Sequence, residues 1–377
     1  MKKNAIVFAL WKKNIGVLQE FMKHNFNCVI LTSSKCVPHH IRDVIVSNGC
    51  EIIYFSELLS KQQYIDLSLE SDGLLSRLEY EIEQAKLTNN NSRIKRCTDI
   101  ASMVIKDLAG LNSAQDKYNI NFTIVNEQYT PLAKAMVLFF NKINISVIYL
   151  SHGASWGKIF TVHDVSHADI YLLAGERFNN SYFFLEKNHN KYSIITGFPS
   201  WDSIYNTIKK TEYVINWQKT YELEKKLPTI TFFTTWVNFF SELHNIQKDI
   251  GVRTLRLMLF AKKQLEGIID FNLIIKDRGG VNHKVHIEKF IKEFNLNSRL
   301  IVHTIDDPCS FLNYSDLIIS IDSTISAEAI VAANAPLNMP SDSAWYYGPC
   351  IGGNDGIINL TEENIVETIT TFLTQPE

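Results

Sequence analysis

A short apolar run, followed at once by polar residues and a helical segment, constrains this chain more than any other feature. Leu317–Ile321 is the kind of run that forms a strand buried on both faces of a parallel sheet. An Asp, a Ser and a Thr come next, and these residues prefer helix N-caps. A strand that leads through such a cap into a helix predicts a binding corner for phosphate-bearing ligands, with Glu328 one turn inside to hold ribose hydroxyls. The alternative is an ordinary connection from a strand to a helix, in which Glu328 is solvated and binds no ligand.

The same alternation of apolar runs and helical segments extends along the whole chain. It predicts an α/β protein with doubly wound parallel sheets. A charged helical stretch before Pro228 suggests a boundary, so we expect an N-terminal Rossmann-like domain over 1–205, a linker over 206–227 and a C-terminal Rossmann-like domain over 228–377. Two such domains would face a cleft. The expected strands are 5–10, 28–31, 51–55, 122–125, 146–150, 170–173, 193–195, 229–233, 272–275, 300–302, 317–321 and 336–339.

Composition excludes several classes of protein. Of the 377 residues, 46 % are hydrophobic and 20 % charged, so the chain can bury a full core. A net charge of −3 gives no reason to expect nucleic-acid binding. The six cysteines are scattered without a C-x-x-C pair, which favours reduced thiols in the cytoplasm. The apolar run near the N-terminus is too short to span a membrane and is interpreted as the first strand.

Two polar groups follow buried strands of the N-terminal half. His152 and Gly153 come directly after the strand 146–150; the glycine permits close backbone approach, and the histidine could act as a general base or bind phosphate. A packed or capping histidine is the alternative. Glu127 follows the strand 122–125 and could deprotonate a hydroxyl or cap the next helix. The sequence leaves both alternatives open.

Further polar groups follow the strands of the C-terminal half. Thr235 comes after the strand 229–233 and offers a hydroxyl at the same edge. Lys276 and Arg278 follow the strand 272–275 beside two glycines, a combination suited to a diphosphate or a carboxylate. A solvated surface loop is the alternative. His283 and His286 are three residues apart, but we identify no carboxylate partner for them and therefore expect no metal site.

Well-known cofactor motifs are absent from the sequence. No G-x-G-x-x-G follows the first strand, and no G-x-x-x-x-G-K-[ST] or G-x-S-x-G occurs anywhere. These absences argue against a nicotinamide-dependent enzyme, a P-loop NTPase and an α/β-hydrolase. We expect no cofactor.

Taken in order, several motifs resemble a known superfamily. They are His152-Gly153, the run Ala168-Asp169-Ile170-Tyr171, the turn Thr196-Gly197-Phe198-Pro199 with Asp202, and Ser315-Asp316-Leu317-Ile318 followed by Asp322-Ser323-Thr324 and Glu328-Ala329. The series is similar to GT-B glycosyltransferases of bacterial surface polysaccharides, chiefly the CDP-glycerol glycerophosphotransferases and the capsule and lipopolysaccharide Kdo transferases. The non-hydrolysing UDP-GlcNAc 2-epimerases are more distant, because their H-x-E-A-G-x-R pattern is not matched after residue 150.

The resemblance implies a function and assigns roles to residues. Ser323, Thr324 and Glu328 would bind the donor nucleotide, and His152 or Glu127 would serve catalysis. The implied enzyme is a metal-independent transferase that moves a sugar or polyol phosphate from a nucleotide-activated donor, cytidine-linked by the same resemblance, to a hydroxyl of a lipid-linked or oligosaccharide acceptor. It would work in the cytoplasm, with peripheral contact to the inner membrane or an assembly complex left open. The alternatives are an epimerase-like enzyme and a catalytically silent scaffold of polysaccharide assembly.

Overall fold

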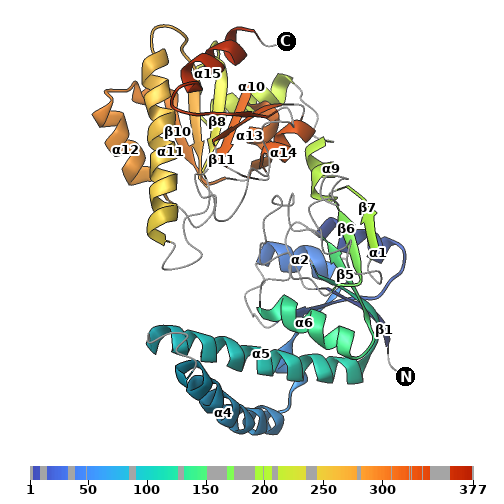
Figure 1. Ribbon diagram of the computed structural model, residues 1–377. Helices are drawn as coiled ribbons and strands as arrows, with labels where there is room; N and C mark the ends of the chain where they lie inside the picture. The colour runs from blue at the N-terminus through green and yellow to red at the C-terminus, as the bar shows by residue number, and fades with distance from the viewer. Residues whose placement is uncertain are drawn as a thin grey trace. The chain divides into compact units, whose positions relative to one another are not determined.

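The computed structural model divides the chain into two compact units, and among the residues it describes the second unit begins at Trp201 (Figure 1). Each unit is described by itself. The described residues are 3–8, 15–32, 39–47, 49–84, 91–125, 131–150, 168–173, 192–197, 199–205, 211–234, 244–277, 282–306, 308–321, 323, 325–332, 334–339 and 357–375.

The first unit contains a seven-stranded sheet in which neighbouring strands are parallel. Its order is β3-β2-β1-β4-β5-β6-β7, so the chain starts in the middle, winds outward to β3 and then returns to wind the other way. This order confirms the predicted doubly wound sheet. The strands are β1 (Lys3–Phe8), β2 (Cys28–Thr32), β3 (Glu51–Tyr54), β4 (Tyr118–Val125), β5 (Ser146–Leu150), β6 (Ile170–Leu173) and β7 (Tyr192–Ile195).

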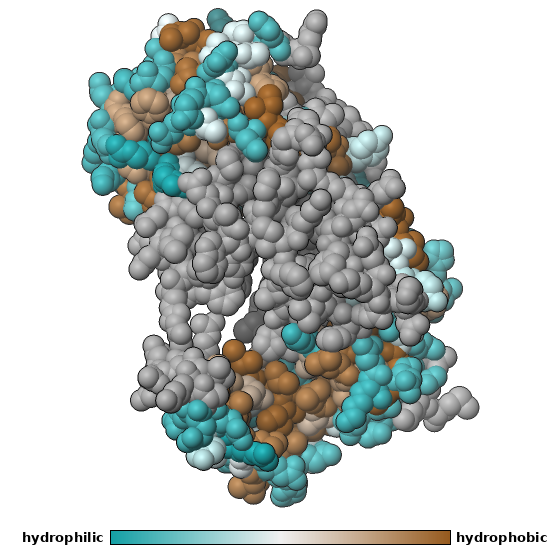
Figure 2. Space-filling view, in the orientation of Figure 1, coloured by the Kyte–Doolittle hydropathy of each residue, from teal (hydrophilic) through white to brown (hydrophobic). Residues whose placement is uncertain are grey.

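Helices of the first unit connect these strands. The region after residue 61 forms two long helices, α4 and α5, which contact each other (Figure 1). Exposed apolar side chains lie on α5 and α6, among them Met103 and Leu138, and Figure 2 shows apolar residues gathered over this region. The helices are α1 (Ile15–Lys23), α2 (His39–Ser47), α3 (Phe55–Leu58), α4 (Lys61–Gln84), α5 (Asn91–Lys117) and α6 (Pro131–Lys142).

The second unit repeats the architecture with six strands. Their order is β10-β9-β8-β11-β12-β13, and all neighbours are parallel. When its strands are numbered from one, this sheet has the order 3-2-1-4-5-6, which is also the order of the first six strands of the first sheet. The winding reverses between β1 and β4 in the first sheet and between β8 and β11 in the second. The strands are β8 (Thr229–Phe233), β9 (Asn272–Lys276), β10 (Ile301–Thr304), β11 (Leu317–Ile321), β12 (Ala335–Met339) and β13 (Ile358–Asn359).

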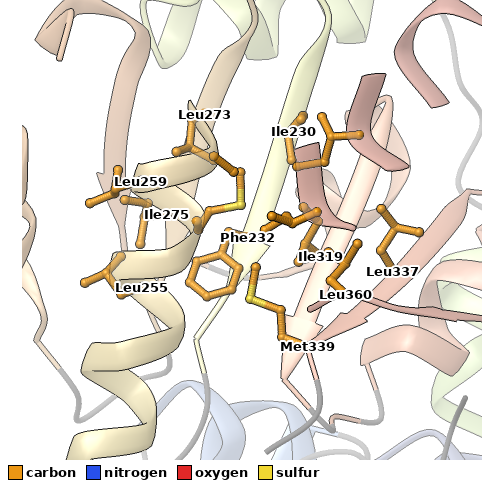
Figure 3. Close-up of a cluster of buried hydrophobic side chains, with 14 of the residues drawn as sticks. Ile230, Phe232, Leu255, Leu259, Leu273, Ile275, Ile319, Leu337, Met339 and Leu360 are labelled. Carbon is orange, nitrogen blue, oxygen red and sulfur yellow. The ribbon is translucent and has the colours of Figure 1, made fainter. Parts of the chain in front are cut away.

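The core of the second unit lies on both faces of its sheet. Phe232 packs in one apolar cluster, with Ile275 and Met339, whereas the next residue, Phe233, packs in a cluster on the opposite face (Figure 3). Because successive side chains of a strand point to opposite faces, a strand buried on both sides must be apolar throughout. The helices are α9 (Pro199–Tyr205), α10 (Thr211–Thr220), α11 (His244–Leu265), α12 (Lys284–Glu293), α13 (Pro308–Tyr314), α14 (Ile325–Val331) and α15 (Ile365–Thr374).

The segment expected to be a linker contributes to this second core. Trp217 of α10 is buried, and its ring lies 5.8 Å from the rings of Phe311 and Tyr314. Leu223, just after α10, is buried in the same cluster. The stretch 211–227 is therefore a packed part of the second unit.

None of the helices that the structure describes is both long enough and apolar enough to cross a membrane.

Candidate functional site

Three neighbouring strands of the second unit end together at the carboxyl edge of the sheet. The backbone N–H of Thr234, after β8, donates to the carbonyl of Lys276 over 3.1 Å, and that of Asp277, after β9, donates to the carbonyl of Thr304 over 2.8 Å. These bonds hold the ends of β8, β9 and β10 in register. Ligands of doubly wound proteins bind beyond the carboxyl ends of the strands, so this edge is where a site is expected.

A buried carboxylate, Asp277, is the centre of a hydrogen-bond network at this edge. Its Oδ1 accepts from Thr234 Oγ1 at 2.8 Å and from His283 Nδ1 at 2.7 Å. Its Oδ2 accepts from the backbone N–H of His283 at 2.9 Å and from His303 Nε2 at 2.5 Å. The side chain of Asp277 is fully buried. Four donors thus occupy the roughly four lone-pair positions that a carboxylate offers.

The hydrogen bonds keep Asp277 ionised. Burial alone would raise the pKa of this carboxyl, but hydrogen bonds from the side chain and backbone of His283, from His303 and from Thr234 together hold that pKa far below its usual range. An ionised carboxylate can only accept hydrogen bonds. It follows that Nδ1 of His283 and Nε2 of His303 both carry protons.

The sequence motifs do not predict this network. The expectation that His283 has no carboxylate partner was wrong, because Asp277 contacts both its ring and its backbone N–H. The two residues are six positions apart in the sequence, so no helical or strand spacing relates them. No sequence motif included His303. The available signal was an Asp directly after one strand and a His within the next strand of the sheet.

Lys276 lies at the predicted edge, in a buried position. Its side chain is buried, and Nζ donates to the carbonyl of Asp277 over 2.6 Å. Its charge also helps to lower the pKa of Asp306, after the hydrogen bonds from Tyr221 and Thr304 to that carboxyl. Lys276 therefore supplies a positive charge within the carboxyl edge. Its predicted role in binding a phosphate stays a prediction.

The second part of the edge lies where the sheet reverses its winding, between β8 and β11. After β11 the Oγ of Ser323 accepts from the N–H of Ile325 over 3.4 Å, and α14 begins there. A buried pair of hydroxyls, Ser320 and Ser326, joins the strand to the helix over 2.7 Å. Glu328 follows on α14 and is only 4 % exposed. The helix α14 is short, with seven residues.

The structure thus places three of the predicted site residues at one sheet edge: Lys276 as the last residue of β9, and Ser323 and Glu328 after β11. Between β9 and β11 lies only β8. The other predicted site residues lie outside the described residues; they are Glu127, His152, Gly153, Thr235, Arg278 and Thr324.

The described part of the chain contains no group of three or more His, Cys, Asp or Glu side chains placed to hold a metal ion. The two histidines and the carboxylate of the Asp277 network do not form such a group, because the ring nitrogen of each histidine that faces Asp277 donates its proton to the carboxylate.

Comparison with known proteins gives the fold. No family model matches the sequence, and no curated protein does. Among solved structures, the UDP-GlcNAc 2-epimerase of Neisseria meningitidis bound to UDP-GlcNAc has a TM-score of 0.61 at 12 % identity, covering all of this chain and 92 % of that one. The UDP-GlcNAc 2-epimerase of Methanocaldococcus jannaschii has a TM-score of 0.56 at 12 % identity, covering 98 % and 99 %.

The wall teichoic acid polymerase TagF also matches, with a TM-score of 0.44 at 12 % identity over 90 % of this chain and 70 % of that one. The likeness to the epimerases, which share the GT-B architecture, extends over both units and agrees with the repeated strand order. The chain has the GT-B fold, built from two Rossmann-like, doubly wound parallel sheets.

Proposed function

We propose that this chain is a GT-B transferase that moves a sugar or polyol phosphate from a nucleotide-activated donor to a hydroxyl of a growing surface polysaccharide. The observation that carries the proposal is the carboxyl edge of the second sheet, where Ser323 and the buried Glu328 follow β11 at the reversal of winding. In doubly wound folds nucleotides bind at this position. The donor is accordingly a nucleotide-activated compound, and the acceptor is a lipid-linked or oligosaccharide chain.

Glu328 is the group that we assign to the nucleotide. A carboxylate with little exposure can hold two hydroxyls of a ribose through charge-assisted hydrogen bonds, which are about twice as strong as neutral ones. Ser323 would donate its hydroxyl to a phosphate oxygen next to it. Lys276 would contribute positive charge from β9. Stabilisation of the leaving phosphate by such fixed groups is a common source of rate enhancement.

In this proposal the acceptor hydroxyl is activated by the first unit. His152 starts with a suitable pKa for a general base, whereas Glu127 would need its pKa raised by burial. We propose that no divalent metal takes part, because the phosphate-binding groups named here are hydroxyls and a cation. Turnover should then survive EDTA, and a strict requirement for Mg²⁺ or Mn²⁺ would contradict this part of the proposal. We place the reaction in the cytoplasm, at the membrane face where the acceptor is anchored.

An epimerase that acts on a UDP-sugar is the second candidate, supported by the fold likeness at a TM-score of 0.61. The two activities differ in what they need. An epimerase converts its nucleotide sugar without any acceptor, whereas a transferase releases the nucleotide only when an acceptor hydroxyl is present. Incubation of UDP-GlcNAc with the protein alone, followed by chromatography of the sugar, separates them. A catalytically silent scaffold would bind nucleotide but give neither product.

Calorimetry tests the nucleotide site directly. CMP, CDP, UDP and GDP are titrated into the wild-type protein, and the tightest binder is titrated into Glu328→Gln. We expect that variant to lose about 1–3 kcal/mol of binding free energy, the usual cost of removing a charged hydrogen-bonding partner. Glu288→Gln is the matched control, because Glu288 is exposed on α12 of the same unit. Equal affinity of wild type and Glu328→Gln would remove Glu328 from the site, and no binding of any nucleotide would overturn the proposal.

A further inference from the structure

The network around Asp277 is more elaborate than a strand end requires. Thr234, His283 and His303 all donate to one carboxylate, from the end of β8, the start of α12 and the third residue of β10. A structural explanation accounts for part of it, because the bond from the N–H of His283 to Asp277 fixes α12 to the sheet. It does not account for His303, whose side chain is 20 % exposed while that of His283 is 5 % exposed.

We infer that Asp277 is a positioning residue that presents His303 to a phosphate group of the nucleotide, an inference that rests on the function proposed above. Nε2 of His303 is committed to Asp277. Only Nδ1 is left to meet a ligand, and in the neutral ring Nδ1 carries no proton and can only accept. A phosphate oxygen is also an acceptor, so it can bind Nδ1 only after the ring has taken up a proton.

The charges near His303 favour such an uptake when an anion binds. Asp277 supplies a negative charge directly at the ring, and Asp306 lies just beyond the end of β10, bonded to Thr304 and Tyr221. Lys276 supplies a positive charge from β9, and the ring of His283 shares the carboxylate. A phosphate that approached a neutral His303 would add a further negative charge to the two aspartates. Protonation of His303 offsets that charge, and the resulting imidazolium donates Nδ1–H to the phosphate and Nε2–H to Asp277.

The proton comes from solvent, so nucleotide binding is linked to pH. Affinity for a phosphate-bearing nucleotide should therefore rise as pH falls from about 8.5 toward about 6.5. A nucleoside without phosphate has no group for Nδ1–H and should show no such rise.

Calorimetry in buffers of different ionisation enthalpy measures the proton uptake itself. With CDP or UDP, whichever binds, we expect an uptake approaching about one proton per nucleotide near pH 7.5, the ceiling for a single imidazole. In His303→Gln the Gln amide can still donate to Asp277 but cannot titrate. This variant should take up no proton and should bind the nucleotide about 10- to 100-fold more weakly, the range for losing a charged hydrogen bond. Its affinity for cytidine or uridine should be unchanged.

His24→Gln is the control, since His24 is an exposed histidine of the first unit. It should retain both the affinity and the proton uptake. Should His303→Gln fail to fold, ¹⁵N resonances of the wild-type histidines test the positioning directly. They should show His283 protonated at Nδ1 and His303 at Nε2 in the free protein, with both nitrogens of His303 protonated once nucleotide is bound.

The outcomes separate this inference from the proposed function. Nucleotide binding without proton uptake, with His303→Gln equal to wild type, would overturn the role of His303 and leave the transferase proposal intact. A free protein with His303 protonated at Nδ1 alone would overturn the positioning by Asp277. Failure of every nucleotide to bind would overturn the proposed function and this inference together.

Discussion

Gly110 of α5 and Phe55 of α3 pack so closely that a Cβ atom at Gly110 would lie 2.6 Å from the Cβ of Phe55. Phe55 is itself buried in the core of the first unit. The near end of its side chain cannot move without the backbone, so there is no room for even one methyl group. Close contact between these two helices therefore depends on the absence of a side chain at position 110.

Gly110→Ala should consequently destabilise the protein, although alanine favours helices by about 1 kcal/mol over glycine. We expect a net loss of about 1–3 kcal/mol, the usual cost of overpacking a core, measured by urea denaturation. Gly73→Ala is the matched control, because Gly73 lies inside α4 with nothing within 4 Å of the added Cβ. That variant should gain about 0.5–1 kcal/mol. Stabilisation by both substitutions would contradict the packing described for α3 and α5.

Asp107 predicts a pH dependence of stability. It is buried on α5, its Oδ2 has no hydrogen-bond partner, and burial raises the pKa of its carboxyl to about 6. Between the usual pKa near 3.8 and this value, the folded state holds a proton that the unfolded state has lost. The free energy of unfolding should therefore fall as pH rises through this window.

Asp107→Asn removes the charge and should remove this slope. At pH 8 we expect the variant to be more stable than wild type by about 1–3 kcal/mol, the cost of a buried unsatisfied group, and at pH 4 nearly equal. Urea denaturation at the two pH values measures the difference. Asp99→Asn, at an exposed position of the same helix, should change neither value. If the free energy of unfolding of the wild-type protein rose between pH 4 and 6 in the same way as that of Asp107→Asn, this assignment would be ruled out.

Tyr221 links the chain after α10 to the end of β10. Its hydroxyl donates to Asp306 over 2.7 Å, and burial together with Asp306 raises the pKa of Tyr221 to about 12. Tyr221→Phe removes this hydrogen bond but keeps the ring contact with Phe311 at 5.1 Å. We expect a loss of about 0.5–1.5 kcal/mol near neutral pH.

The loss should shrink in acid. Hydrogen bonds from Tyr221 and Thr304 lower the pKa of Asp306, so the stability that they contribute is present above the unfolded-state pKa and disappears as pH falls. Thermal unfolding of wild type and Tyr221→Phe at pH 7 and pH 3 checks this. Tyr205→Phe serves as control, since Tyr205 is 77 % exposed. A difference that stays constant in acid would mean that the ring, and not the bond to Asp306, accounts for the effect.

Glu328 should affect stability as well as binding. From the sequence alone Glu328 is expected to hold ribose hydroxyls or to be solvated, but its side chain is buried. Glu328→Ala would leave space and unpaired neighbours, so we expect a clearly lower melting temperature, with a loss of about 1–3 kcal/mol. Glu328→Gln, of nearly the same shape, should lose less. Melting temperatures of both variants equal to wild type would restore the interpretation of Glu328 as a purely ligand-binding group.

Variants of His152 and Glu127 test which of the two residues is the general base. His152→Ala and Glu127→Gln should each lose at least ~10²-fold in turnover, the lower end of what general-base removal costs. Donor affinity, measured by calorimetry, should change by no more than a few-fold, because the nucleotide residues are in the other unit. Near-normal turnover of Glu127→Gln with an inactive His152→Ala would assign Glu127 to a helix cap. Full activity of both variants would mean that neither residue is the general base.

Most of the fold could be predicted because burial on both faces leaves a simple signal. The runs 146–150, 170–173, 229–233 and 317–321 coincide with β5, β6, β8 and β11. The strand that was not expected is β13, which has only two residues and is too short to show a pattern. The charged residues after position 211 suggested a linker. The helix α10 nevertheless packs against the core of the second unit, because its large apolar side chain Trp217 is buried there.

The site was harder to predict because it depends on contacts between strands. Ser323 and Glu328 are adjacent to one apolar run, and the sequence alone pointed to them. The pairing of Asp277 with His303 depends on the order of β9 and β10 in the sheet, and Asp277 and His283 are six positions apart in the sequence. Neither relationship follows from a helical or strand period, so no period in the sequence could have revealed the network.

The all-parallel pairing of both sheets has a consequence for folding. No described strand pair is a hairpin, and Lys3 of β1 pairs with Tyr118 of β4, across the entire α4–α5 region. Because non-local contacts are formed only after the entropy of a long loop has been lost, folding should be slow for a chain of this length. On the ribosome, β1 must wait for β4 before the middle of its sheet can form. Until β4 has been synthesised, the edge of β1 that pairs with β4 stays unpaired, and during this interval the nascent chain is most exposed to aggregation.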